Sequence, residues 1–290
     1  MKVHTPGLFL TLSLLTVISM VTVAEDIDRG WESQITQKLV EETVIGKIIW
    51  CNTGESSFLT LFNGQPAPRS RGAAIILHGM GAHPDWPEVI APIRLTLPDR
   101  GWSTLSIQLP VLAPEMPVAA YGKTVKESGQ RIRAAVKMLR DMEFSNIVII
   151  GHSFGAATAA SYIAGNNGNG ILAFVSIGIR SQKFLNPTLD LMDQIEKINI
   201  PVFDVYGSRD FDDIVRSAAD RRLAASKNGN HAYRQTEIRD ADHNFIGLES
   251  ALINLISDWL EYVTQKDTVV ATDGINGQDE TNNDLLDTSQ

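Results

Sequence analysis

The segment Gly151-His152-Ser153-Phe154-Gly155 places a serine between two glycines, directly after an apolar run. The run Ile147–Ile150 is typical of a buried strand, and the alanine-rich stretch after Gly155 favours a helix. A serine at the apex of a strand–turn–helix can act as an exposed nucleophile in acyl transfer. Glycines flank it because a Cβ there would clash with the neighbouring strand or helix. Short glycine–serine patterns also recur in loops, so the flanking strand and helix are what make Ser153 the predicted nucleophile.

A serine hydroxyl needs a general base, and only two histidines follow Ser153 in the chain. His243 lies between the last predicted strand and the last predicted helix, where the base of such a sheet is expected. His231 lies in a polar turn before a strand, and we expect it to be solvated. Asp210 follows the preceding strand and is the predicted acid that orients His243.

Other aspartates near these positions have different expected roles. Asp212 and Asp213 compete with Asp210, but they fit better as first-turn residues of a helix, where the helix dipole favours acidic side chains. Asp204 lies inside an apolar strand, so its carboxylate needs a partner. It is either a residue that supports the site or a structural hydrogen-bond acceptor. Asp242 adjoins the predicted base and is expected to cap the last helix.

The oxyanion formed in acyl transfer requires two backbone N–H donors. Phe154, the residue after the serine, is expected to supply one of them. Met80 is the predicted second donor and Gly81 the next candidate, because the glycines in this loop allow close approach of the backbone.

The same loop carries His83 and Trp86, which are candidates for substrate binding, although packing explains Trp86 equally well. A metal site formed by His78, His83 and Asp85 is the alternative. We do not favour it, because the loop that carries these residues is already explained as the source of an oxyanion donor. We therefore expect neither a metal nor another cofactor.

The elements that must position these residues alternate between strands and helices. This alternation predicts an α/β fold with a mostly parallel central sheet and helices on both faces. The short stretch between Ile179 and Ile200 leaves room for a minimal cap only, so the site is open or covered by short loops such as Pro110–Tyr121. Besides Ile147–Ile150, the predicted strands are 48–50 and 58–62, which form a hairpin, 73–77, 102–109, 171–179, 201–206 and 233–239; the predicted helices, besides the one after Gly155, are 89–97, 121–142, 212–225 and 245–262.

Residues 25–265 are the predicted domain, and the two ends of the chain are expected to lie outside it. Residues 1–24 resemble a secretory signal peptide, with an apolar run between Lys2 and the small residues 22–24. An uncleaved membrane anchor is the alternative, but the run is short for a span, which needs roughly 20 residues. Residues 266–290 are acidic and polar, which predicts a disordered tail.

The composition narrows the expected compartment and partners. Cys51 is the single cysteine, which excludes an internal disulfide, and its apolar neighbours predict a buried, inert thiol. Export without disulfides is compatible with a periplasmic or secreted bacterial protein. The body carries no basic patch of the kind that binds nucleic acid. We expect no stable membrane span after cleavage of the signal, and the oligomeric state stays open.

Four segments together resemble the α/β-hydrolase superfamily over about residues 45–264: the His78-Gly79 loop, the serine turn, the Gly207–Asp210 loop and the Asp242-His243 loop. The stretches LHGMGAHPDWPEVI and GWSTLSIQLP are similar to the bacterial family DUF3530. That resemblance implies the hydrolase fold without an established substrate. The superfamily also includes haloperoxidases, acyltransferases, lyases and inactive members, so the fold alone does not determine the reaction.

The favoured function is that of an exported serine hydrolase. Ser153 would attack an ester or related acyl bond of a small-molecule or lipid-like substrate, and water would cleave the acyl-enzyme. An acyltransferase uses the same residues and differs only in the acceptor. A non-catalytic cell-envelope binding protein on the same fold is the alternative from another class, and the complete set of Ser153, His243 and Asp210 argues against it.

Overall fold

The computed structural model describes Met1 and residues 30–42, 45–66 and 70–276, with side chains up to Gln265. The predicted signal segment beyond Met1, and residues 277–290 of the predicted tail, lie outside the described residues. The predictions for those two segments therefore stay predictions.

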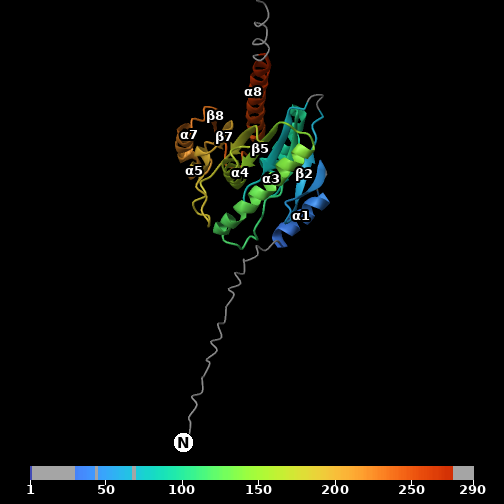
Figure 1. Ribbon diagram of the computed structural model, residues 1–290, viewed down its shortest axis with the longest axis vertical. Helices are drawn as coiled ribbons and strands as arrows, with labels where there is room; N and C mark the ends of the chain where they lie inside the picture. Colours follow the sequence, from blue (N-terminus) through green and yellow to red (C-terminus); the bar gives the residue numbers. More distant parts are fainter. Residues whose placement is uncertain (2–29, 43–44, 67–69, 277–290) are drawn as a thin grey trace, which may run out of the picture.

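An eight-stranded sheet forms the centre of the molecule, in the order β1-β2-β4-β3-β5-β6-β7-β8 (Figure 1). In this spatial order, every neighbouring pair from β4 through β3 to β8 is parallel. The strand β2 is antiparallel to both β1 and β4. The predicted opening hairpin and the mostly parallel sheet are thus confirmed. The strands are β1 (Lys47–Asn52), β2 (Ser57–Asn63), β3 (Gly72–Leu77), β4 (Trp102–Ile107), β5 (Ile147–His152), β6 (Ala173–Ile177), β7 (Val202–Gly207) and β8 (Tyr233–Ile238).

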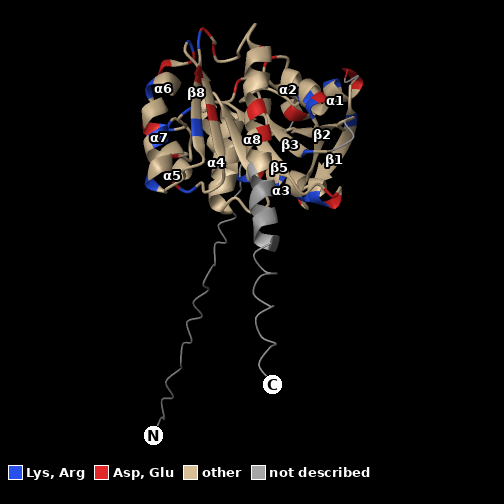
Figure 2. Ribbon diagram, turned by 90° about the horizontal axis from the view of Figure 1, so that it is seen from above, with Lys and Arg blue, Asp and Glu red and all other residues tan. Residues whose placement is uncertain are grey.

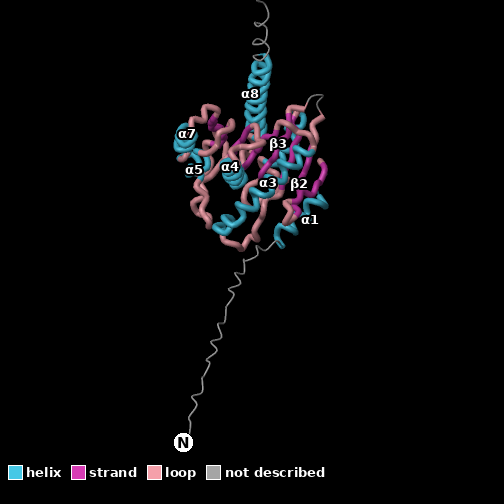
Figure 3. Tube along the Cα trace, in the orientation of Figure 1, coloured by secondary structure: helices cyan, strands magenta, loops and turns pink. Residues whose placement is uncertain are grey.

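Helices cover both faces of the sheet, as the apolar central strands require. Alternate residues of β3 divide between two cores: Ile75 packs in the core with α3 (Val125–Asp141), α4 (Phe154–Gly165), α5 (Leu191–Glu196) and α7 (Ala218–Lys227). Ile76 packs in the core with α2 (Ile90–Thr96) and α8 (Glu249–Asn276). Figure 3 shows α3 and α4 lying over the central strands.

The helix α1 (Gly30–Glu42) has no counterpart among the predicted elements. Ile35 and Leu39 pack against Leu59 and Leu61 of β2. Their four-residue spacing is the helical signal that could have found it. Figure 2 shows α1 and the β1–β2 hairpin at one end of the sheet, with α5, α6 (Asp212–Arg216) and α7 at the other.

Three predicted helices are not continuous α-helices in the structure. The helix predicted over 89–97 is α2 followed by the 3₁₀ helix η1 (Leu97–Arg100), and the one predicted over 121–142 begins as the 3₁₀ helix η2 (Val118–Thr124) before α3. The helix predicted over 212–225 breaks between α6 and α7. Arg221 explains that break, because its Nη1 donates to the carbonyl oxygen of Ile214 and to the hydroxyl of Ser217, at 2.8 and 2.9 Å.

The last helix also differs from its predicted bounds of 245–262. Phe245 and Gly247 have φ values of 55° and 75°, which an α-helix does not accept, so α8 begins at Glu249. Its backbone continues to Asn276, into the first part of the segment predicted as a tail. None of the helices in the described ranges is long and apolar enough to cross a bilayer.

Two smaller predictions are confirmed. The stretch between β6 and β7 contains only one short helix, α5, so the cap is minimal. Cys51 is buried on β1 with its thiol free. Burial raises the pKa of that thiol, which disfavours the reactive thiolate.

Candidate active site

Ser153 connects β5 to α4 in a strained turn. Its φ and ψ are 54° and −116°, a conformation that residues other than glycine rarely adopt. A Cβ on Gly151 would lie 2.6 Å from the Cα of Ala156, and one on Gly155 would lie 2.4 Å from a carbonyl oxygen of β3. The predicted reason for the flanking glycines is therefore confirmed. The N–H of Ser153 donates to the carbonyl oxygen of Ile177 at 2.9 Å, which ties the turn to β6.

Asp210 and His243 meet at the same edge of the sheet. His243 Nδ1 lies 2.7 Å from Asp210 Oδ1, and the Asp210 side chain is fully buried. The N–H of Phe211 donates to the same oxygen at 2.7 Å. Because an ionised carboxylate only accepts hydrogen bonds, Nδ1 of His243 carries the proton in the neutral tautomer, whose lone pair is then on Nε2.

The end of β6 brings the three predicted catalytic residues into one neighbourhood. Gly178 follows β6 with a φ of 54°, and a Cβ there would lie 3.1 Å from Asp210 Oδ2 and 3.2 Å from the His243 ring. The residue before it, Ile177, accepts the hydrogen bond from Ser153. Ser153, Asp210 and His243 thus follow β5, β7 and β8 around the carboxyl end of β6, where sites of parallel sheets lie.

His152 holds the backbone of the His243 loop, a contact that sequence reasoning did not find. Its Nε2 lies 2.9 Å from the carbonyl oxygen of His243, so Nε2 carries the proton and donates. The rings of His152 and His243 are 4.8 Å apart. The Phe211 ring makes a separate contact with the His243 ring, at 4.5 Å. Burial, and then the nearby His243, lower the pKa of His152 to about 4, which keeps it neutral near pH 7.

His78 orients the loop after β3. Its Nδ1 lies 2.8 Å from the carbonyl oxygen of Gly79, and its Nε2 accepts from the N–H of Leu109 at 3.0 Å. Burial lowers the pKa of His78 to about 3, so the ring is neutral and Nδ1–H is the donor. The N–H of Ala82 also donates to Gly79, at 3.2 Å. Since a trans peptide is planar, a fixed Gly79 carbonyl aims the N–H of Met80 the opposite way.

Phe154 and Met80 differ from Gly81, the next candidate, in whether the backbone group already has a hydrogen-bond partner. Phe154 begins α4, so its N–H has no acceptor within the helix. In the described part of the chain, no acceptor is found for the N–H of Met80. The backbone of Gly81, by contrast, hydrogen-bonds the Tyr121 hydroxyl. This favours Met80 over Gly81 as the second donor.

His83 and Trp86 contact each other rather than the serine turn. Their rings lie 5.2 Å apart, edge to face, and Trp86 packs against the core shared by α2 and α8. Over the described ranges, no ring contact or hydrogen bond joins either residue to Ser153 or His243. Their predicted role in substrate binding therefore stays a prediction.

The residues of the alternative metal site have other partners. Both ring nitrogens of His78 bind backbone groups, and His83 Nδ1 accepts from the N–H of Asp85 at 3.2 Å. The Asp85 carboxylate accepts from Arg94 Nε at 3.0 Å. These hydrogen bonds explain all three side chains without a metal.

The remaining aspartates divide into confirmed and corrected predictions. Asp212 and Asp213 lie in the first turn of α6, as predicted. Asp242 does not cap α8. Its Oδ1 accepts from the N–H groups of Asn244 and Ile246, at 3.0 and 3.2 Å, and so closes the turn before that helix.

Asp204 is a buried structural acceptor. Its Oδ2 accepts from Arg221 Nε at 2.7 Å, from the Tyr233 hydroxyl at 2.6 Å and from Gln235 Nε2 at 2.7 Å. The network joins β7, β8 and α7 and answers the question that the sequence left open. His231 is exposed before β8, as predicted.

The chain matches known proteins through its family and its fold. A family model described as "Protein of unknown function (DUF3530)" matches residues 31–130 and 119–262. None of the curated proteins matches the chain.

Several solved structures share the fold at low identity. Est1E from Butyrivibrio proteoclasticus is 15% identical, with a TM-score of 0.62 over 74% of this chain and 98% of that chain. A dienelactone hydrolase from Anabaena variabilis is 18% identical, with a TM-score of 0.61 over 75% and 97% of the two chains. An α/β serine hydrolase without lid from Xanthomonas campestris is 14% identical, with a TM-score of 0.57 over 76% and 94%. The chain thus has the α/β-hydrolase fold and belongs to the DUF3530 family.

Proposed function

We propose that this chain is a serine hydrolase that cleaves an ester or related acyl bond, with Ser153 as nucleophile, His243 as general base and Asp210 as the acid that orients it. The observation that carries this proposal is the 2.7 Å contact between His243 Nδ1 and the fully buried Asp210, at the sheet edge where Ser153 projects from a strained turn.

The reaction follows from the proton positions. Ser153 Oγ forms a bond to the carbonyl carbon of the substrate, and its proton passes to the free Nε2 of His243. The hydrogen bond from Nδ1 to Asp210 stabilises the imidazolium that forms. The same proton then passes to the departing alcohol as the acyl-enzyme forms. Water attacks the acyl-enzyme, gives its proton to His243, and releases the acid with Ser153 restored.

The oxyanion of each tetrahedral intermediate would accept from the N–H groups of Phe154 and Met80. Support for Met80 comes from His78, whose hydrogen bond to Gly79 fixes the shared peptide plane. His152 would hold His243 in place through its hydrogen bond to the backbone carbonyl oxygen of His243.

We further propose that the protein is exported, that residues 1–24 are cleaved, and that the substrate is a small-molecule or lipid-like acyl compound. The minimal cap supports an open site. The N-terminal sequence of the mature protein recovered from the bacterial periplasm or medium tests the cleavage. A mature chain that retains residues 1–24 would instead support the membrane anchor.

Labelling with a fluorophosphonate probe tests the nucleophile. We expect the purified wild-type protein to be labelled at Ser153, which peptide mass spectrometry identifies, and Ser153→Ala to remain unlabelled. Ser161→Ala, which removes a serine from the same helix α4, is the matched control and should label as wild type does. Absence of labelling in the folded wild-type protein would refute the hydrolase proposal in favour of a non-catalytic binding protein.

Turnover on a panel of acyl esters, thioesters and amides then defines the bond. Est1E is known with ferulic acid bound, so a ferulate ester belongs in the panel beside short-chain and long-chain esters. Comparison of acid release with acyl transfer to added alcohols separates a hydrolase from an acyltransferase. A His243→Ala variant with wild-type turnover would show that the proposed base is wrong.

A further inference from the structure

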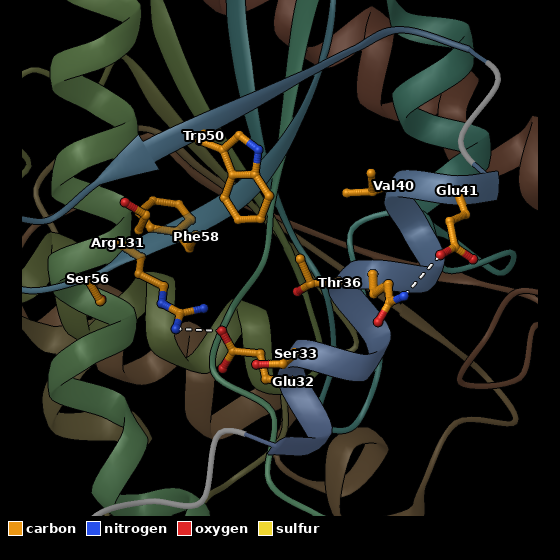
Figure 4. A pocket seen from close by; sticks show the side chains of 11 residues that line it. Glu32, Ser33, Thr36, Val40, Glu41, Trp50, Ser56, Phe58 and Arg131 are labelled. Atoms are coloured by element: carbon orange, nitrogen blue, oxygen red, sulfur yellow. Dashed lines mark hydrogen bonds and ion pairs between the residues drawn. The ribbon is translucent and has the colours of Figure 1, made fainter.

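A cleft of about 540 Å³ lies between α1, the β1–β2 hairpin and α3 (Figure 4). This volume is within the range of about 300–1,000 Å³ that small-molecule sites occupy. Because β2 runs antiparallel to β4, the hairpin turn lies at the same edge of the sheet as the carboxyl end of β4. The hairpin end of the cleft therefore lies on the side of the sheet where the strand ends carry Ser153, but next to β1.

An exposed indole forms one wall of the cleft. Trp50 on β1 is 54% exposed, although it lies within a strand whose neighbour Cys51 is buried. Figure 4 shows Trp50 and Phe58 on one side, with Thr36 and Val40 of α1 across from them. The cleft thus offers a flat aromatic face to a ligand and a helix surface opposite it.

A buried ion pair forms the end of the cleft. Arg131 of α3 is 1% exposed, and its Nη2 lies 2.7 Å from Glu32 and 2.8 Å from Glu127. Its Nη1 donates to the carbonyl oxygen of Gln108 at 2.9 Å, and its guanidinium lies over the Phe58 ring at 5.3 Å. Two carboxylates neutralise this one cation, so the cleft holds no free positive charge that would attract an anion.

The side of the cleft formed by α1 also carries neutral polar groups, beside the carboxylate of Glu41. The hydroxyls of Ser33 and Thr36 line the cleft, and in the described ranges neither has a hydrogen-bond partner. Gln37 donates to Glu41 at 3.1 Å and keeps further hydrogen-bonding capacity. The polar groups of α1 thus face the aromatic side chains of Trp50 and Phe58 across the cleft.

We propose that this cleft binds a neutral carbohydrate, with one sugar ring stacked on Trp50 and its hydroxyls hydrogen-bonded to Ser33, Thr36 and Gln37. A sugar ring has an apolar C–H face that fits an indole and a rim of hydroxyls that both donate and accept. The cleft presents those two complementary surfaces across from each other. The inference is independent of the proposed hydrolase function.

The test is calorimetric titration of the purified protein with neutral tetrasaccharides of β-linked glucose, α-linked glucose and β-linked N-acetylglucosamine. We expect saturable binding of at least one of them with a Kd below about 1 mM. Trp50→Ala should weaken that binding at least about tenfold, because it removes both buried area and the ring face. Tyr262→Ala, which removes an exposed aromatic ring from α8, is the matched control and should bind as wild type does.

Two further variants locate the binding. Thr36→Val keeps the side-chain shape and removes the hydroxyl, so it should weaken binding severalfold while the protein stays folded. Ser153→Ala should bind the saccharide as tightly as wild type, which separates this cleft from the candidate active site. The inference is overturned if no tetrasaccharide binds, if Trp50→Ala binds as wild type does, or if neutral tetrapeptides bind in the cleft and saccharides do not.

Discussion

Two buried histidines beside the candidate site link folding to pH. Burial is the first cause of both shifts: it lowers the pKa of His152 to about 4 and that of His78 to about 3, from 6.5. The Asp210 carboxylate near His152 raises its pKa, but this effect is smaller than that of burial.

The sign of the effect follows from which state binds the proton. The unfolded chain protonates both imidazoles near pH 6.5, whereas the folded protein keeps them neutral down to about pH 4 and pH 3. Stability is therefore fully present above pH 6.5 and is lost as the pH falls toward those folded values. By pH 5 each histidine removes about 2 kcal/mol of the free energy of unfolding.

Urea denaturation at pH 7.5, 6 and 5 measures this effect. His152→Gln keeps an N–H that can donate to the carbonyl of His243 but has no proton to take up. We expect this variant to lose about 2 kcal/mol less than wild type between pH 7.5 and 5. His231→Gln removes an exposed histidine and serves as the control. If His152→Gln and wild type lose the same free energy, His152 is not held neutral by burial and the reasoning is refuted.

Three further predictions test packing and catalysis. Gly155→Ala should cost about 3 kcal/mol or more in urea denaturation, because its Cβ would lie 2.4 Å from a backbone oxygen. Gly165→Ala in the same helix has no atom within 4 Å of its Cβ and should stay within about 1 kcal/mol of wild type. Tyr233→Phe removes the hydroxyl 2.6 Å from a buried carboxylate and should lower the free energy of unfolding by about 2 kcal/mol, whereas an unchanged value would show that this hydrogen bond is not stabilising. Asp210→Asn should lower kcat for the best panel ester by roughly 10³–10⁴-fold with the fold intact by circular dichroism, and a loss below tenfold would place the orienting acid elsewhere.

The local pattern around Ser153 determined the central part of the fold. A buried strand, two obligatory glycines and an alanine-rich helix are encoded by neighbouring residues, so their types and spacing are readable without the rest of the chain. The same holds for the hairpin, for the parallel strands and for the order in which Asp210 and His243 follow their strands. Helix bounds were less readable, because a distant side chain can compete for helix carbonyls, as Arg221 does between α6 and α7.

Tertiary structure alone decided which groups meet. The sequence placed an unexplained aspartate at position 204, and only the packing of α7 and β8 against β7 supplied Arg221 and Tyr233 as its partners. The sequence likewise assigned no role to His152, although its ring hydrogen-bonds the loop that carries His243. Such contacts join residues far apart in the chain, so no local spacing reports them. By itself the sequence determined the fold class and the candidates for catalysis, whereas the buried neighbours that set their charge and orientation depended on how the elements pack.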